Sequence, residues 1–238
     1  MEKPEFIKLL EKSHVAEIFK AEKSYFLIDQ ISQNAHAINN ARHGHFKPLF
    51  AHLQSVLYRD VIMCLARIYD KPNNKHETLG LQYLLKKMRE SANEFPSISE
   101  NQHFQKELER AGMPEEIIYK LKQMKDSPES AVIEVANFFS GKAKSKELKP
   151  KITSLETLRN KKLAHNDNIE AIETTLTSKD ILDLIEFAKK FIGVLGWFFN
   201  TAYSINGEYI LTDDSKRDSF TLKNIFIELK IIDKTDGN

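Results

Sequence analysis

The sequence has one cysteine, few glycines and prolines, and almost no net charge, and each scarcity excludes a class of protein. Cys64 has no second cysteine for an intrachain disulfide, a CxxC zinc site or a redox pair. Eight glycines and seven prolines in 238 residues are too few for the many turns of a β-rich protein. The 35 basic and 34 acidic side chains give a net charge of +1, so any nucleic-acid binding must be argued from a local segment.

The sequence also lacks long apolar runs. No continuous apolar run approaches the roughly 18 residues that a membrane span needs. The first residues, MEKPEFIKLLEKS, alternate charged and apolar side chains and do not resemble a signal peptide. We therefore expect a cytoplasmic protein with no membrane partner.

The apolar residues recur mostly at steps of three and four, which predicts an all-α fold. The clearest helix follows Pro48 and ends at Lys71-Pro72, and a second long one opens with Ser178 as its N-cap and runs to about Phe199. Shorter helices are predicted over 78–89, 102–111, 114 onward, 127–141, 152–164 and 216–231, with a short strand at 209–211. We expect a single domain over 1–238, with a helical-bundle core at about 20–203 and a C-terminal helical extension at 204–238.

The segment LRNKKLAHND, residues 158–167, carries the strongest chemical signal. Arg159 is a permanent cation that can hold two phosphate oxygens, and His165 can exchange a proton near neutral pH. These residue types suit metal-free phosphodiester cleavage, in which the 2′-hydroxyl of RNA is the nucleophile. The alternative interpretation is a helix C-cap histidine and a surface arginine.

The spacing within this segment has a geometric consequence. On an unbroken α-helix, six positions turn through about 600°, so Arg159 and His165 would point about 120° apart and lie about 9 Å apart along the axis. Either the helix breaks near Ala164, or the working site combines residues from two chains.

RNKKLAH resembles the signature of the HEPN superfamily, in which an arginine and a polar residue precede a histidine. Ala164 before the histidine and Asp167 after it are similar to the abortive-infection U-type branch, and so is LARIYDKPNNKHETLGLQYLL at 65–85. The resemblance implies a HEPN-like helical bundle with additional helices. It also implies a homodimer in which two copies of the motif form a metal-independent endoribonuclease site without a cofactor.

Residue by residue, the resemblance implies that Arg159 stabilises the scissile phosphate and that His165 acts as acid or base. Asn160 would orient the histidine or a phosphate oxygen. The family further implies a role as a toxin or phage-defence effector, with RNA as substrate and an antitoxin protein as a possible partner.

A local excess of positive charge adjoins the motif. Residues 141–162 hold eight basic and two acidic side chains, a net of +6, and the remaining 27 basic and 32 acidic side chains give −5. A lysine-rich stretch can simply be a solvated face, but here it can also engage phosphates. The predicted substrate-binding residues are Lys149, Lys151, Lys161, Lys162 and Asp167.

Other candidate sites have simpler explanations. The stretch with His36, His43, His45 and His52 lacks metal-ligand spacing, so we predict a polar helix end and loop around Gly44 and no metal site, although a contact with RNA stays open. Arg67 and Asp70, one turn apart, predict an intrahelical ion pair. Cys64 and the aromatic run 197–199 lie on apolar stripes and predict packing.

Two functions compete with the nuclease. A non-catalytic HEPN-like module would use the basic segment to hold RNA, a nucleotide or a protein, with binding but no turnover. A structural partner, such as a helical antitoxin-like protein, would bury the Arg159 and His165 pairs or keep them apart. Fold alone does not choose among these functions.

Overall fold

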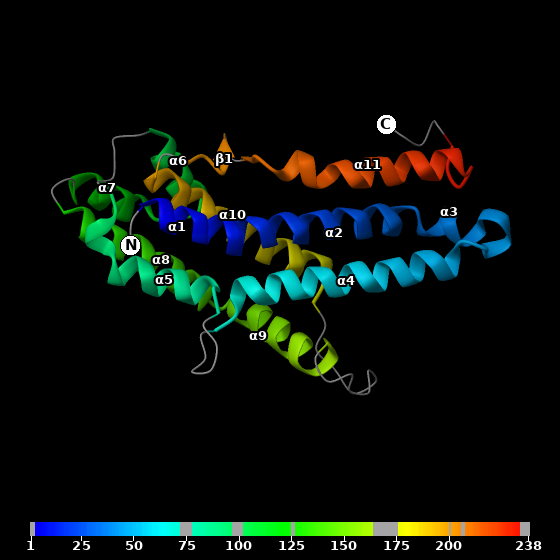
Figure 1. Ribbon diagram of the computed structural model, residues 1–238, viewed down its shortest axis with the longest axis horizontal. Helices are drawn as coiled ribbons and strands as arrows, with labels where there is room; N and C mark the ends of the chain where they lie inside the picture. The colour runs from blue at the N-terminus through cyan, green and yellow to red at the C-terminus, as the bar shows by residue number, and fades with distance from the viewer. Residues whose placement is uncertain are drawn as a thin grey trace. The chain divides into compact units, whose positions relative to one another are not determined.

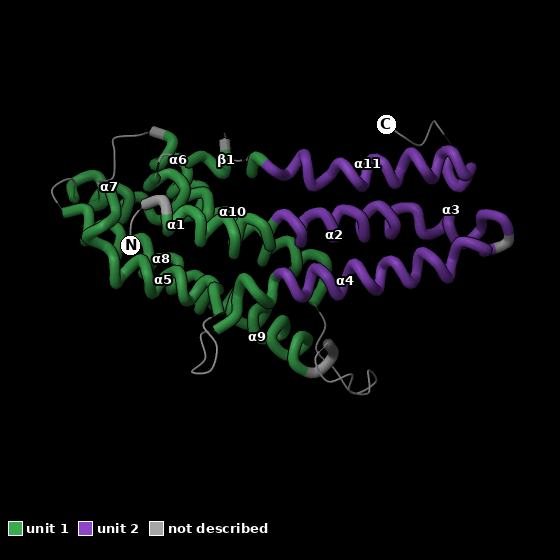
Figure 2. The backbone as a smooth tube through the Cα atoms, viewed as in Figure 1, with its two compact units in different colours: residues 1–18, 65–210 green, residues 19–64, 211–238 purple. Residues whose placement is uncertain are grey.

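The computed structural model describes residues 3–71, 78–96, 102–124, 127–163, 176–199, 201–205 and 208–233. Within them the chain is all-α apart from one two-stranded antiparallel hairpin (Figure 1), as the apolar spacing predicts. The described residues form two compact units, of residues 1–18 with 65–210 and of residues 19–64 with 211–238 (Figure 2). This division differs from the predicted bundle core at 20–203 with a separate extension, because the segment 211–238 shares a unit with 19–64.

The helices and strands follow one another in this order: α1 (Lys3–Leu10), the π-helix η1 (Glu11–Val15), α2 (Ala16–Gln33), α3 (Ala35–Asn40), the 3₁₀ turn η2 (Ala41–Gly44), α4 (Lys47–Tyr69), α5 (Leu81–Glu90), the 3₁₀ turn η3 (Ala92–Glu94), α6 (Gln102–Arg110), α7 (Glu115–Gln123), α8 (Pro128–Ala143), α9 (Lys149–Thr157), the π-helix η5 (Leu158–Leu163), α10 (Ser178–Phe198), β1 (Ser204–Ile205), β2 (Glu208–Tyr209) and α11 (Thr212–Glu228). In the hairpin, Ser204 pairs with Tyr209 and Ile205 with Glu208.

The first unit is built around α10, which buries side chains on most of its surface. α8 packs against α5, and α6 packs against α10. Phe139 of α8 and Phe191 of α10 are both fully buried, with ring centroids 5.1 Å apart in an edge-on arrangement. This confirms that the stripe starting at Ile181 marks a central helix.

The N-cap of α10 lies one residue earlier than predicted. Thr177, rather than Ser178, is the N-cap: its Oγ1 accepts a hydrogen bond from the Asp180 backbone N–H, and the Asp180 carboxylate accepts one from the Thr177 N–H. This reciprocal capping box satisfies two helix-end donors at once, which the serine could not do from the next position.

The second unit has a core of its own. Its buried residues come from α2, α3, α4, α11 and the turn after α11, and they are Ile31, Ile38, Phe50, Phe226, Ile231 and Ile232. Glu22 of α2 is 3% exposed, and its carboxylate accepts hydrogen bonds from Thr212 and Ser215 at the start of α11. The C-terminal helix is therefore held by both apolar packing and buried hydrogen bonds.

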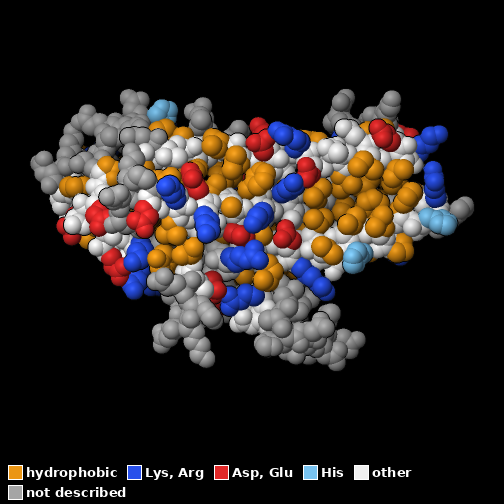
Figure 3. Space-filling view, viewed as in Figure 1, with side chains coloured by type: hydrophobic (Ala, Val, Ile, Leu, Met, Phe, Trp, Pro, Cys, Tyr) orange, Lys and Arg blue, Asp and Glu red, His pale blue; other side chains and the backbone are white. Residues whose placement is uncertain are grey.

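α4, with 23 residues, is long and apolar enough to cross a membrane by length and composition alone. Arg59 and Asp60 interrupt its apolar residues, so it is not a continuous apolar run. Figure 3 shows hydrophobic side chains gathered over the part of the face that the second unit occupies in Figure 2. Three large hydrophobic residues of α4 are exposed, namely Leu49, Leu53 and Val56. Other residues of α4 serve the protein interior, since Ile62, Leu65 and Ile68 are buried and Asp60 accepts a hydrogen bond from Ser24.

Candidate active site

Arg159 lies in a short π-helical segment that continues α9. The regular α-helix ends at Thr157 and the π-helix η5 covers Leu158–Leu163, so the helix predicted to run to Ala164 changes its hydrogen bonding before the motif begins. Leu155 and Leu158 are buried and fix one side of this junction. π-Helical turns are rare and occur frequently at functional sites.

The Arg159 side chain is held by two partners. Its Nη1 lies 2.7 Å from Oδ1 of Asp70, at the end of α4, and its Nε donates a hydrogen bond of 3.0 Å to Oδ1 of Asn160. The Arg159 side chain is 27% exposed and that of Asp70 is 25% exposed, so the ion pair is partly shielded from water. A guanidinium has five N–H donors, and these two contacts leave the Nη2 hydrogens available for a further acceptor.

The predicted intrahelical pair between Arg67 and Asp70 is wrong. Arg67 Nη1 instead pairs with Oε2 of Glu17 at 3.0 Å, and Asp70 pairs with Arg159. Both partners come from other helices, 50 and 89 positions away in the sequence. Residues at the end of α4 therefore form ion pairs with two segments distant in sequence, at Glu17 and Arg159, and not with each other.

A second ion pair runs beside the first. Nζ of Lys71 lies 2.8 Å from Oε1 of Glu156, which is on α9. In the first ion pair the end of α4 supplies the acid, Asp70, and in the second it supplies the base, Lys71. The segment with the motif supplies the opposite charges, Arg159 and Glu156. The two ion pairs tie the end of α4 to the segment that carries the motif.

The backbone near Asp70 is also tightly packed. A Cβ on Gly80 would lie 2.4 Å from the carbonyl oxygen of Asp70, a distance at which backbone must move. Only glycine lets the segment before α5 approach the end of α4 this closely. Substitution of Gly80 would push Asp70 away from its present position.

A pocket of about 260 Å³ lies next to this bridge. Its lining includes Lys12 and Ser13 from the π-helix η1, Arg67 from α4, Asp70 directly after α4, and Thr78 before α5. Thr78 Oγ1 is buried and has no hydrogen-bond partner among the described residues. Asp70 thus contacts Arg159 and borders a polar hollow.

The remaining predicted site residues fall into three groups. Lys149 is exposed at the start of α9. Lys151 is engaged within the fold. His165 and Asp167 lie outside the described residues, as do the side chains of Lys161 and Lys162. Their predicted roles stay predictions.

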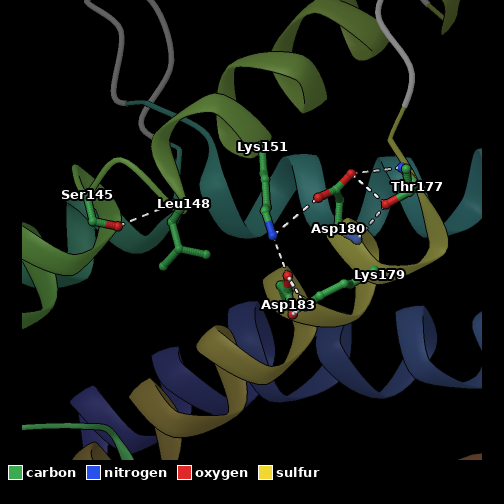
Figure 4. A network of polar contacts seen from close by, with 7 residues as sticks. All are labelled: Ser145, Leu148, Lys151, Thr177, Lys179, Asp180 and Asp183. Carbon is green, nitrogen blue, oxygen red and sulfur yellow. Dashed lines mark hydrogen bonds and ion pairs between the residues drawn. The ribbon is translucent and has the colours of Figure 1, made fainter.

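Lys151 connects the beginnings of α9 and α10 (Figure 4). Its ammonium pairs with Asp183 and lies 3.2 Å from Oδ1 of Asp180, and Asp183 also binds Lys179. The hydrogen bond to Asp183 raises the pKa of Lys151, and it lowers that of Asp183. The pKa of Asp180 is lowered first by its hydrogen bond with Thr177 and then by Lys151. Since both carboxylates neutralise this lysine, the structure uses it as a helix-to-helix bridge.

Cys64 and the aromatic run agree with the packing predicted for them. Cys64 is buried, as are Phe198 and Phe199. Among the described residues no group of histidine, cysteine, aspartate and glutamate side chains has the arrangement of a metal site. His36, His45 and His52 are exposed, around the turn where Gly44 has a φ of +80°.

Sequence reasoning missed the contacts that position the motif. Helical spacing pairs Asp70 only with a residue of its own helix, and it predicts no bridge between Lys71 and Glu156. Neither contact leaves a periodic signal, because each joins residues more than 80 positions apart. The one available signal was the likeness of residues 65–85 to the same family as the motif.

The family model HEPN_AbiU2, described as AbiU2, matches residues 3–219, which is most of the chain and includes α4, α9 and η5. No curated protein and no solved structure matches the chain. The chain therefore belongs to the HEPN_AbiU2 family, the abortive-infection U2 branch of the HEPN superfamily.

Proposed function

We propose that this protein is a metal-independent RNA endonuclease whose site is completed by two copies of the chain. The observation that carries the proposal is the position of Arg159, held by Asp70 in a π-helical turn of a HEPN-family chain. A guanidinium fixed by an acid on one edge can present its other edge to a phosphate. The adjoining basic segment supports an anionic substrate.

The chemistry assigned to the site needs no bound group. The 2′-oxygen of the substrate attacks the adjacent phosphorus while His165 removes its proton, and the bond from phosphorus to the 5′-oxygen breaks. The partner's His165 delivers a proton to that leaving oxygen, which yields a 2′,3′-cyclic phosphate and a 5′-hydroxyl. Arg159 stabilises the additional negative charge on the phosphate oxygens in the transition state. One motif histidine per chain, together with a reaction that transfers two protons, favours a homodimer.

The contacts of Asn160 narrow the role that the sequence predicted for it. It accepts a hydrogen bond from Nε of Arg159, so it fixes the plane of the guanidinium. We assign it to positioning Arg159 rather than to direct contact with substrate. Asp70 acts in the same way from the other side of the guanidinium.

The test is cleavage of a mixed RNA pool in excess EDTA by the parent protein, Arg159→Ala and His165→Ala. Arg217→Ala and His103→Ala are matched controls, because they remove the same side-chain types from exposed positions outside the motif. The proposal requires activity in the parent and both controls, with a loss of at least about a hundredfold in the two site variants. An inactive parent that still binds RNA would favour the non-catalytic module.

The proposed biological role is that of a toxin or phage-defence effector, kept silent by an antitoxin partner. Expression of the parent should arrest growth, and His165→Ala should relieve the arrest at equal protein level. Growth arrest that is unchanged in His165→Ala would separate toxicity from RNA cleavage and contradict this role.

A further inference from the structure

A second and larger pocket lies in the same unit as Arg159. Its volume is about 500 Å³, within the range of small-molecule binding sites. It is formed where the end of α4, the start of α5, the end of α8 and the start of α9 meet. The residues that matter here are Lys71, Leu81, Gln82, Lys144, Lys149 and Ile152.

The charge of this pocket has one sign. Three lysines line it, and no acidic side chain does. Lys71 is paired with Glu156, whereas Lys144 and Lys149 are exposed and form no ion pair with the other described residues. Two unneutralised lysines in the lining of one pocket are suited to a phosphate.

The rest of the lining is largely apolar. Leu81 and Tyr69 are buried, and Ile152 is half-buried. The Tyr69 hydroxyl donates to the carbonyl oxygen of Leu184, and its burial raises its pKa, so this ring acts as a neutral wall. Gln82 adds an amide with two donors and an acceptor. An apolar wall with one amide suits a nucleobase, whose faces are apolar and whose edge forms hydrogen bonds.

We propose that this pocket binds one nucleotide of the RNA substrate, with its phosphate at Lys144 and Lys149 and its base against Leu81, Ile152 and Gln82. The assignment rests on the proposed function and identifies a substrate subsite for it. Its link to the cleavage site is direct, since Lys71 at the pocket binds Glu156, and the adjacent Asp70 binds Arg159. α9 begins with Lys149 and leads into Arg159, so one helix joins the two sites.

The test uses the His165→Ala protein, in which binding is measured apart from cleavage. Affinity for a short single-stranded RNA is determined by fluorescence anisotropy at several salt concentrations. Lys144→Gln with Lys149→Gln is compared with Lys120→Gln and Lys106→Gln, a control pair that removes the same charge from exposed lysines outside the pocket and outside the basic segment. Thermal melts confirm that each protein is folded.

The pocket pair should bind about tenfold more weakly than the parent at moderate salt. The slope of log affinity against log salt should fall by about 1.4, from roughly 0.7 for each lost contact with a single strand. The control pair should change the affinity by less than about twofold. Equal losses in both pairs would overturn the subsite, since the effect would then come from net charge.

Gln82→Ala tests the base part of the pocket. It should weaken RNA binding about threefold with no change in the salt slope, because an amide releases no counterions. A lowered slope in Gln82→Ala would contradict its assignment to the base.

Free nucleotides separate this proposal from the proposed function. If RNA is cleaved but Lys144→Gln with Lys149→Gln cleaves and binds like its control, the subsite is wrong and the nuclease stands. If no RNA is cleaved by the parent, yet adenosine or guanosine monophosphate binds and the pocket pair abolishes that binding, the nuclease fails and nucleotide recognition stands. Competition of RNA binding by these monophosphates supports the shared pocket.

Discussion

The ion pair between Arg159 and Asp70 gives the sharpest quantitative prediction. Two unit charges about 4 Å apart attract by about 1 kcal/mol in water and by about 4 kcal/mol at an effective dielectric constant of 20. Both side chains are about one-quarter exposed, so the pair lies between these limits and loses part of the attraction to desolvation. We expect a coupling free energy of about 1 kcal/mol between the two side chains.

A double-mutant cycle measures this coupling. Asp70→Asn, Arg159→Gln and the double variant are unfolded with urea beside the parent, and the non-additive part of the free energy of unfolding is the coupling. Lys71 with Glu156 is the matched control pair, because the Lys71 side chain is 68% exposed and should give about 0.5 kcal/mol or less. A coupling near zero for Arg159 and Asp70, or a larger one for the control pair, would contradict a partly shielded ion pair at Arg159.

The same substitution has an expected effect on catalysis. Asp70→Asn keeps the shape of the side chain but removes the charge that orients the guanidinium. We expect kcat for RNA cleavage to fall about tenfold while KM changes by less than about twofold, since the transition state depends more on that orientation than binding does. Asp70→Glu should restore part of kcat. A fall only in the amount of folded protein would assign Asp70 to stability alone.

Three further predictions concern stability and charge. Burial lowers the pKa of His14 to about 3. As pH falls below about 6.5, the unfolded chain therefore binds a proton at this histidine before the folded protein does, and the free energy of unfolding should fall by about 2 kcal/mol between pH 7 and pH 5. Urea titrations should show this loss in the parent and not in His14→Leu. Lys151→Met should cost about 1–3 kcal/mol at pH 7 by removing the ammonium that Asp180 and Asp183 share, and the cost should shrink as pH falls through the lowered pKa values of these acids. Lys149→Glu should raise the free energy of unfolding by about 0.5 kcal/mol, because α9 has no acid in its first turn. The same variant should bind RNA more weakly. A variant that is more stable and binds RNA as tightly as the parent would argue against the pocket.

The sequence predicted best those helices whose apolar residues repeat at regular spacing within one segment. The stripe from Leu49 to Ile68 and that from Ile181 to Phe198 are long enough for helical periodicity to identify α4 and α10. The N-cap of α10 was misplaced by one residue, although the Thr177–Asp180 spacing is itself the capping-box pattern.

What sequence did not predict depends on contacts between distant segments. The partner of Asp70 was wrong because helical spacing considers only the same helix, whereas Arg159 lies 89 positions away. Phe226 packs against Phe50 with ring centroids 5.2 Å apart, and no pattern in either helix indicates that α11 shares a unit with α4 rather than extending the chain. The change to π-helical bonding at Leu158 likewise has no periodic signal.

The most direct test of the central claim is the cleavage rate, in excess EDTA, of one RNA and of the same RNA with a 2′-deoxynucleotide at the cut position. We predict that the parent cuts the first and leaves a 2′,3′-cyclic phosphate, that it does not cut the second, and that His165→Ala cuts neither. Cleavage that stops in EDTA, or that proceeds at the deoxynucleotide, would contradict a site in which Arg159 and His165 act on the substrate's own hydroxyl.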